Sequence, residues 1–402
     1  MQATIFWIGR LCRSLAEIAA LRIYLDHNAT TPLHGAVLEC MASQLRGGFG
    51  NPSTTYAEGA AARSAVEMAR GQVATCLGLE PREIFFTSGA TEANNTVLQA
   101  LARGEGGDDR HLVISEAEHP SVLEPGRWLE GQGVRVTRLP VDSEGRLDPA
   151  DVEAALRDDT ALVSLLWANN ETGVIQPMEE ISSRLQARGV PLHTDATQVV
   201  GKYPIDLGRV AASYVSISAH KLGGPKGVGC LAARSPEGFP PLLLGGSQER
   251  RRRGGTENVL GIAGFGVACE RARLELAERM ERYSALRDYL WQGLQAKVPE
   301  VRRNGSGADV LPNTLNVEFR GAEGEVLLQA LDLEGISVSM GAACHAGSIS
   351  PSHVLEAMGR RPEEARASLR FSVGQGVDEV QIDRVVEVLD ELVPRVRKAE
   401  RA

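Results

Sequence analysis

The stretch YVSISAHKLGGPKGVGCLAA, residues 214–233, places a lysine between two runs of β-forming residues. Lys221 follows the run 214–218, and four glycines stand within the nine positions after it, at 223, 224, 227 and 229. A lysine that is desolvated at the end of a strand can form a covalent link with an aldehyde cofactor. Considered by itself, a lysine in this position is more often a solvated loop lysine.

Short β-rich runs alternate with helical patterns on either side of this stretch, from residue 58 to about residue 260. The other runs are IFFTS (84–88), HLVIS (111–115), VRVTRL (134–139), ALVSLLW (161–167) and VPLHT (190–194). Residues 91–102 and 179–187 have helical apolar spacing, and Asp148 before Pro149 is typical of a helix start. The alternation predicts an α/β fold with a mostly parallel sheet flanked by helices. Ligands bind such sheets at the carboxyl ends of the strands.

The pattern changes after the Arg- and Gly-rich segment QERRRRGGTEN, residues 248–258. A long helical stretch at about 259–298 is followed by strands near TLNVEF, ISVS and SLRFS and by a helix from 378 to about 397. We therefore expect a large cofactor-binding domain at 23–260 and a smaller α+β domain at 261–402. Residues 1–22 are interpreted as an N-terminal extension.

Composition excludes several classes of function. The chain has 402 residues, and 43 Lys and Arg against 52 Asp and Glu give a formal charge of −9, which disfavours nucleic acids and anionic membranes as partners. Apolar runs fall short of the roughly 18 residues that a spanning helix needs. The six cysteines form no C-x-x-C pair, which argues against structural zinc and disulfides and favours a reducing, cytoplasmic location. We expect no metal.

Polar residues follow several of the predicted strands. Ser88, Gly89, Ala90 and Thr91 stand between a strand and a helix start, where free backbone N–H groups suit a phosphate. Plain helix capping by Thr91 is the alternative. Ser218 and His220, beside Lys221, would be further donors to the phosphate.

Two more strand ends carry groups suited to an aromatic cofactor. Asp195 and Gln198 follow VPLHT, where a carboxylate can hold a ring nitrogen protonated and an amide can bond a ring hydroxyl. His119 follows HLVIS, where an imidazole can stack on a ring and move protons. An N-capping Asp and a structural His are the alternatives. Nucleotide cofactors are a weaker explanation, because the sequence has no Walker lysine motif and no G-x-G-x-x-G after a strand.

The chain resembles the cysteine desulfurases of the NifS/IscS type, which belong to the fold-type I, class V aminotransferase group of pyridoxal-phosphate enzymes. The resemblance covers about residues 23–397. Its motifs stand here, in order, as YLDHNATTP, GNPST, FTSGATEANN, EAEHPSVL, ANNETGVIQP, HTDATQ, SAHKLGGPKG, GGSQERRRRGGTEN, NTLNVEF, SMGAACHAGS and SLRFSVG.

The resemblance implies roles for individual residues. Lys221 would bind the cofactor covalently, with Ala90, Thr91, Ser218 and His220 around its phosphate. His119 would stack on the ring, Asp195 would pair with its nitrogen, and Gln198 and Asn170 would lie near its hydroxyl. Thr256 would reach the phosphate in the neighbouring subunit, which implies a homodimer. Arg370 would bind the α-carboxylate of the substrate through its guanidinium fork.

Cys344 stands in the Gly-, Ala- and Ser-rich stretch SMGAACHAGSISPS. Small neighbours and the adjacent His345 suit an exposed thiolate nucleophile on a loop. The resemblance implies that this thiolate takes sulfur from L-cysteine, releases L-alanine and retains a persulfide. The sulfur would then pass to an acceptor protein, such as a scaffold for iron-sulfur cluster assembly.

Two departures point to a related activity. Tyr56 stands where these desulfurases usually have a histidine, and A-A-C-H replaces the common S-A-C-[ST]. Both features resemble selenocysteine lyase, which releases selenide and L-alanine. The eight-residue spacing from Cys344 to Ser352 resembles the long-loop desulfurases instead. We therefore expect a cysteine desulfurase, with selenocysteine lyase as the alternative.

Overall fold

The computed structural model of the chain describes residues 22–103, 110–234, 240–305, 307–341 and 350–400. Most of the N-terminal extension and the whole stretch around Cys344, residues 342–349, lie outside the described residues. None of the described helices is both long and apolar enough to span a bilayer.

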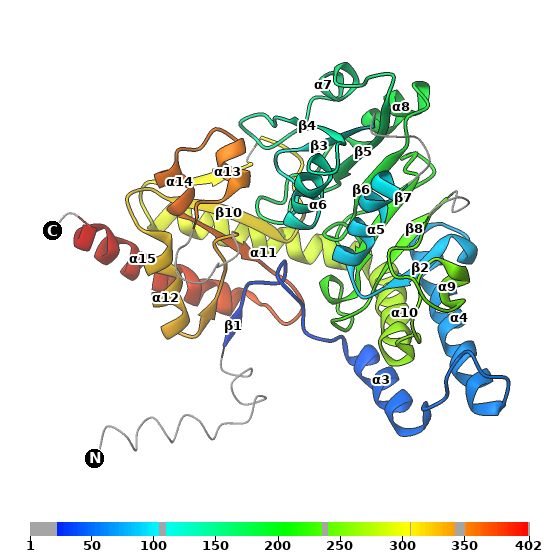
Figure 1. Cartoon of the computed structure of the whole chain (residues 1–402). Helices are drawn as coiled ribbons and strands as arrows, with labels where there is room; N and C mark the ends of the chain where they lie inside the picture. The colour runs from blue at the N-terminus through cyan, green and yellow to red at the C-terminus, as the bar shows by residue number, and fades with distance from the viewer. Residues whose placement is uncertain (1–21, 104–109, 235–239, 306, 342–349, 401–402) are drawn as a thin grey trace, which may run out of the picture.

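A seven-stranded sheet forms the centre of the larger part of the molecule (Figure 1). In spatial order its strands are β2 (Ile84–Thr87), β8 (Gly229–Ala233), β7 (Tyr214–Ser218), β6 (Leu192–Asp195), β5 (Thr160–Leu166), β3 (His111–Ser115) and β4 (Arg135–Leu139). Strand β8 is antiparallel to both of its neighbours, whereas the pairs from β7 to β4 are parallel. The predicted mostly parallel sheet is therefore confirmed.

Helices cover both faces of this sheet. The helices of this part are α3 (Gly35–Gly47), α4 (Ala57–Leu77), α5 (Ala90–Arg103), α6 (Pro120–Glu130), α7 (Pro149–Ala154), α8 (Met178–Ala187), α9 (Gln248–Arg251) and α10 (Val259–Leu274), with short 3₁₀ turns at Pro81–Glu83 and Ala219–Lys221. Alternate residues of a strand face opposite sides. Thus Val113 packs in the cluster of α4, α8 and α10, while Leu112 and Ile114 pack with α5 and α6.

The smaller part is built from both ends of the chain. Its elements are β1 (Ile23–Tyr24), α11 (Leu276–Lys297), β9 (Val301–Asn304), β10 (Thr314–Phe319), α12 (Gly324–Leu333), β11 (Ile336–Ser337), α13 (His353–Ala357), α14 (Pro362–Arg366), β12 (Ser368–Ser372) and α15 (Glu379–Glu400). Strands β12, β10 and β9 form an antiparallel sheet, and β1 pairs in parallel with β11.

The packing differs from the sequence prediction at two places. The helical stretch expected at 259–298 is two helices, because Glu275 leaves helical geometry between α10 and α11 (φ −99°, ψ 4°). Helix α10 packs on α3 and α4, and Leu25 beside β1 packs in the hydrophobic cluster of α11, α12 and α15. The domain boundary at residue 260 stays a prediction.

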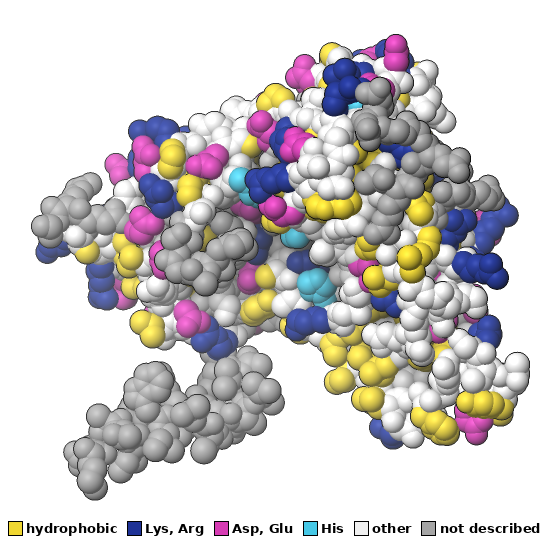
Figure 2. Space-filling model, viewed as in Figure 1, with side chains coloured by type: hydrophobic (Ala, Val, Ile, Leu, Met, Phe, Trp, Pro, Cys, Tyr) yellow, Lys and Arg dark blue, Asp and Glu magenta, His cyan; other side chains and the backbone are white. Residues whose placement is uncertain are grey.

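Large apolar side chains are exposed around α3 and α4. Phe49 and Leu244 are each 84% exposed, and Leu45 is 73% exposed. Leu38, Tyr56 and Met68 are exposed in the same two helices or in the segment between them. Figure 2 shows hydrophobic side chains gathered over this region, at the lower right of the view. A gathering of exposed large apolar side chains is typical of protein interfaces.

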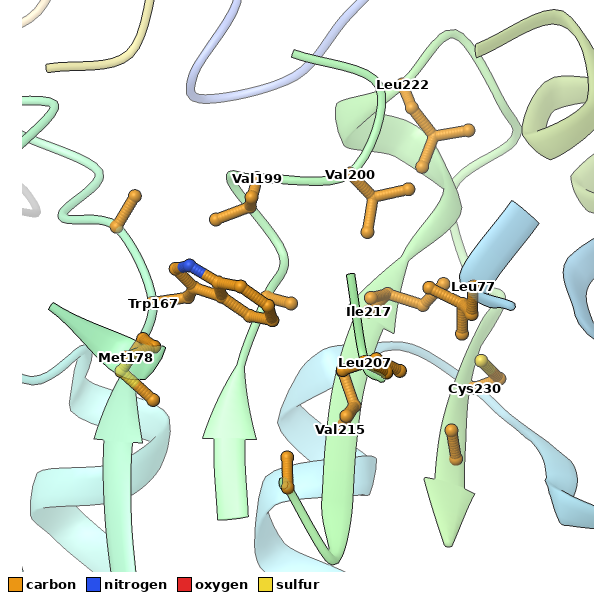
Figure 3. Packing of buried hydrophobic residues seen from close by; sticks show 14 of the residues in the cluster. Leu77, Trp167, Met178, Val199, Val200, Leu207, Val215, Ile217, Leu222 and Cys230 are labelled. Atoms are coloured by element: carbon orange, nitrogen blue, oxygen red, sulfur yellow. The ribbon is translucent and has the colours of Figure 1, made fainter. Parts of the chain in front are cut away.

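The largest hydrophobic cluster includes residues that closely follow the strand ends of the sheet. Trp167, Val199 and Leu222 lie just after β5, β6 and β7, and Figure 3 shows them above the side chains of the sheet. All three are less than 6% exposed. The polar residues that neighbour them in sequence are therefore attached to a closely packed base, which limits their motion.

Candidate active site

The carboxyl ends of the parallel strands border a cavity of about 660 Å³ between the two parts of the molecule. The cavity is lined by these predicted site residues: Ala90, Thr91, His119, Asn170, Asp195, Gln198, Ser218, His220, Lys221 and Arg370. The other two predicted residues are not among them. Thr256 lines a separate cavity of about 150 Å³, and Cys344 lies outside the described residues.

Lys221 is held at the end of β7 by backbone oxygens. It closes the 3₁₀ turn Ala219–Lys221, and its Nζ donates to the carbonyl oxygens of Asn28 (2.6 Å) and Ala29 (2.7 Å). Burial and the nearby Arg370 guanidinium lower the pKa of Lys221 to about 8, although Asp26 opposes the shift. A neutral, nucleophilic amine is therefore accessible just above neutral pH.

A chain of hydrogen bonds joins Asp195 to His119. Asn94 donates through Nδ2 to Asp195 Oδ2 (2.8 Å) and to Ser121 Oγ (2.9 Å). His119 Nδ1 accepts from the backbone N–H of Ser121 (3.1 Å) and lies 2.7 Å from Ser121 Oγ. A nitrogen that accepts carries no proton, so the proton of the neutral ring is on Nε2. Burial lowers the pKa of His119, which favours this neutral ring.

Asp195 and His119 also make local hydrogen bonds to the backbone. Asp195 Oδ1 accepts the backbone N–H of Thr197 (2.9 Å), and His119 is the N-cap of α6. These local bonds use Asp195 Oδ1 and His119 Nδ1. They fix the two side chains in place while the side chains line the cavity.

The start of α5 forms the part of the cavity predicted to bind phosphate. Gly89 has a φ of 154°, and a Cβ on Gly229 would lie 2.8 Å from the Gly89 Cα, so β8 and this turn approach closely only as glycines. Glu92 accepts from the Ser88 N–H (2.8 Å) and from Arg253 Nε (3.0 Å). Although burial opposes it, these bonds lower the pKa of Glu92. Arg253 thus balances the one carboxylate in the first turn of α5.

Arg370 is oriented by partners on both parts of the molecule. It lies on β12, and its two terminal nitrogens donate to Asn170 O (3.0 Å) and to Asp26 Oδ1 (2.5 Å). Its Nε is buried and has no hydrogen-bond partner among the described residues. Arg370 therefore has donor capacity left for an anionic ligand.

Asn28 links the cavity to both parts of the chain. Its side chain accepts from Lys202 (3.1 Å) and Asn313 (2.9 Å) and donates to Asn170 O (3.1 Å) and Thr314 Oγ1 (2.8 Å). We call the set Asp26, Asn28, Asn313, Thr314 and Arg370 the Asn28 junction. We call the set His119, Asp195, Gln198, Ser218 and Lys221 the sheet wall.

Comparisons with known proteins agree with this geometry. The family model described as "Aminotransferase class-V" matches residues 23–385. The cysteine desulfurase IscS of Dictyoglomus turgidum is 43% identical over 375 residues, which cover 93% of this chain and 95% of the relative. A solved structure titled "NIFS-LIKE PROTEIN" has a TM-score of 0.87 at 37% identity and covers 93% of this chain and all of that chain. A second, "SspA in complex with cysteine", has a TM-score of 0.77 at 35% identity and covers 87% and 98%.

The chain belongs to the cysteine desulfurases of the class-V aminotransferase family. The predicted family, the fold type and the enzyme class are therefore confirmed, and so is pyridoxal 5′-phosphate as the cofactor. The alternative of selenocysteine lyase is not favoured, since the similar relatives are named cysteine desulfurases.

The residues of the cavity fit this cofactor. It offers an amine with a lowered pKa at Lys221 and a carboxylate at Asp195, together with a helix start at Ala90. Thr197, which also lines the cavity, has a buried hydroxyl oxygen without a hydrogen-bond partner among the described residues. The amine of Lys221 suits an aldehyde, the carboxylate of Asp195 suits a ring nitrogen, and the helix start at Ala90 suits a phosphate.

Several residues of the site were not found from the sequence. Asp26 and Asn28 stand in the motif YLDHNATTP, but the residues to which they hydrogen-bond in the site, Arg370 and Asn170, are more than 140 positions away in the sequence. Lys202 follows Gln198 by four residues, and its position in the apolar run VVGK is the one local signal of burial. Glu118 is fully buried beside His119, and burial raises its pKa to about 8.

Proposed function

We propose that the chain converts L-cysteine to L-alanine and retains the sulfur as a persulfide on Cys344. The donors at Arg370, the lowered pKa of Lys221 and the neutral His119 support this proposal. The observation that carries it is the convergence of these groups on one cavity in a cysteine desulfurase fold. The similar SspA, solved in complex with cysteine, supports cysteine as the substrate.

Each residue has a task that follows from its chemistry. Bound pyridoxal phosphate supplies an electron-withdrawing ring that labilises bonds at the substrate α-carbon. Lys221 would anchor the cofactor, and its free amine, with its pKa lowered to about 8, would serve as a base. Asp195 keeps the ring nitrogen protonated, and Ala90, Thr91, Ser218 and His220 hold the phosphate. Arg370 orients the substrate carboxylate.

The sulfur step balances without an added oxidant. The Cys344 thiolate attacks the substrate sulfur, so that an S–S bond forms while the bond from sulfur to the substrate β-carbon breaks. The electron pair of that bond goes to the carbon, which takes up a proton and becomes the methyl group of alanine. The enzyme is left with a persulfide, which a thiol of the acceptor protein can attack.

We infer that the active form is a homodimer in which a second copy covers the apolar surface around α3 and α4. The segment 243–256 connects exposed apolar surface with the site. It contains exposed Leu244 and Thr256, the residue predicted to reach the phosphate of the neighbouring subunit. Within the segment, the backbone N–H of Gly254 donates to the carbonyl oxygen of Leu243 (2.9 Å). The cavity of Thr256 shares Ser88 and Gly227 with the large cavity. A dimer would bring Thr256 of the partner subunit to the side of the large cavity that Ser88 and Gly227 line.

We further propose a cytoplasmic enzyme whose acceptor belongs to iron-sulfur cluster assembly. The cysteines without C-x-x-C spacing support a reducing compartment, and the spacing between Cys344 and Ser352 supports sulfur transfer to a protein.

The deciding assay compares alanine and sulfide release from L-cysteine with alanine and selenide release from L-selenocysteine. We expect turnover of cysteine, and a persulfide on Cys344 detected by mass spectrometry after a single turnover without reductant. Cys344→Ala should still bind the cofactor but form no persulfide. Selenocysteine lysis with negligible cysteine turnover by the wild type would contradict the proposal.

A further inference from the structure

Lys202 lies in the interior behind the cofactor cavity and is 4% exposed. Its Nζ lies 2.6 Å from Gln198 Oε1 and 3.1 Å from Asn28 Oδ1. Burial lowers the pKa of Lys202 well below its usual value, and the positive charges of Lys221 and Arg370 act in the same direction. An amine donates hydrogen bonds whether or not it is protonated, so both contacts persist in either state.

The contacts of Gln198 fix which way its amide points. Gln198 Nε2 donates to the carbonyl oxygen of Asn28 (3.0 Å), and Oε1 accepts from Lys202. In the flipped amide, Oε1 would face the Asn28 carbonyl oxygen and Nε2 would face the Lys202 amine. The observed orientation is therefore the one that pairs each donor with an acceptor, and it leaves a second N–H on Nε2.

Gln198 and Lys202 line different cavities. Gln198 lines the cofactor cavity, whereas Lys202 lines a separate cavity of about 30 Å³, and Lys221 borders both. Lys202 is thus placed to act on a ligand in the cofactor cavity through Gln198.

We propose that Lys202 is a positioning residue that holds the Gln198 amide with an N–H group presented to the cofactor ring hydroxyl. The inference rests on the proposed function and on the place near that hydroxyl that the family resemblance implies for Gln198. A donor to the ring oxygen stabilises its anionic form and so favours loss of the proton from the linkage between cofactor and Lys221. Without Lys202, Gln198 Oε1 is left buried and unpaired, and the amide loses one of the two contacts that orient it.

Other ionisable groups also face the two lysines. They are Asp26 and His27 from the N-terminal segment, His119 after β3, Asp195 after β6, His220 in the 3₁₀ turn, Arg279 and Tyr283 from α11 and Arg370 on β12. A test must therefore separate the action of Lys202 through Gln198 from its direct effect as a charge. A double-mutant cycle does so, because all these groups are common to the four proteins.

The experiment titrates the visible absorption of the cofactor-loaded dimer without substrate, for the wild type, Lys202→Met, Gln198→Ala and the double variant. Loss of one hydrogen bond to the ring oxygen should raise the pH midpoint by about 0.5 to 1 unit in each single variant. In the Gln198→Ala background, Lys202→Met should add no further shift. Lys202→Arg, which keeps a donor, should stay closer to the wild type than Lys202→Met does.

The outcomes separate this inference from the proposed function. An equal shift by Lys202→Met with and without Gln198 would show a direct charge effect and overturn the inference. A shift in Gln198→Ala but not in Lys202→Met would also overturn it. If instead the wild type formed no absorbing adduct at Lys221, the proposed function would fail. Lys297→Met removes an exposed lysine at the end of α11 and should leave the midpoint unchanged. Should Lys202→Met not fold, Lys202→Leu, a smaller apolar replacement, makes the same test.

Discussion

The sheet wall and the Asn28 junction meet at the same cavity, which Asn28 and Arg370 of the junction line, but they are built in different ways. Each side chain of the sheet wall lies within four residues of the end of β3, β6 or β7, so local sequence places it. The Asn28 junction joins residues 286 and 344 positions apart, as in the bonds from Asn28 to Thr314 and from Arg370 to Asp26. A strand end can be read from a short pattern, whereas a long-range junction exists only once segments far apart in the sequence have packed together.

The two regions should therefore fail differently when changed. Removing a sheet-wall residue takes away a group that we propose contacts the cofactor, and it leaves the packed base of Trp167, Val199 and Leu222 intact. Removing a junction residue leaves buried polar partners unpaired on both parts of the molecule, which costs stability. The four predictions below run from the largest expected effect to the smallest.

Lys221→Ala should abolish turnover completely, because it removes the one covalent attachment proposed for the cofactor. Borohydride treatment followed by mass spectrometry should find the adduct on Lys221 in the wild type and on no residue of the variant. The unfolding midpoint of the cofactor-free protein should change little or rise, since a buried amine is lost. An adduct that persists on another lysine would contradict the assignment.

The same variant sharpens the prediction of a shared site. Lys221→Ala and Thr256→Val protomers, each impaired alone, should regain part of the activity when unfolded and refolded together. Only heterodimers can combine an intact Lys221 with an intact Thr256 from the partner. Full activity of a monomer in sedimentation experiments would rule out this arrangement.

Asn28→Ala should lower the free energy of unfolding of the cofactor-free protein by about 3 kcal/mol. The side chain makes four hydrogen bonds, three of them buried, but the partners keep other bonds, such as the one from Lys202 to Gln198, so the loss is less than four full penalties. Urea titration measures the change. Gln329→Ala, which removes an exposed amide on α12 that bonds Glu325 (3.3 Å), is the matched control and should stay within about 0.5 kcal/mol. A loss at Asn28 no larger than that of the control would mean that the junction does not join the two parts.

Much of the fold follows from sequence pattern alone. The run TLNVEF coincides with β10. The predicted helix at 91–102 is one residue shorter than α5 at each end, and the predicted helix at 179–187 begins one residue after α8 does. The break at Glu275 has no proline or glycine to mark it, so periodicity alone predicts one helix.

Other features depend on contacts that no local pattern encodes. Glu249, Arg250 and Arg251 have positive φ values of 44°, 55° and 66°, a conformation that costs L-residues energy. Glu249 is held there by two hydrogen bonds of 2.8 Å from buried Arg70, 179 positions away. Lys202 is similar, because its amine is satisfied by the oxygens of Asn28 and Gln198, which the sequence does not show to be neighbours.

Arg370 is hydrogen-bonded within the Asn28 junction and also lines the cofactor cavity. Its variants can therefore affect both the stability of the protein and the binding of substrate. Asp26 and Asn170 orient its guanidinium, and the buried Nε stays available for the substrate carboxylate. Arg370→Ala should lower kcat/KM for L-cysteine by roughly 30-fold, the equivalent of about 2 kcal/mol for a charge-assisted contact, mainly through a higher KM. Arg370→Lys keeps the positive charge beside Asp26 but not the fork. It should therefore recover the stability of the cofactor-free protein more fully than it recovers KM. Steady-state alanine formation and urea unfolding of both variants measure the two effects separately. An unchanged KM with lowered stability would assign Arg370 to the junction alone, and the substrate carboxylate would then need another partner in the cavity.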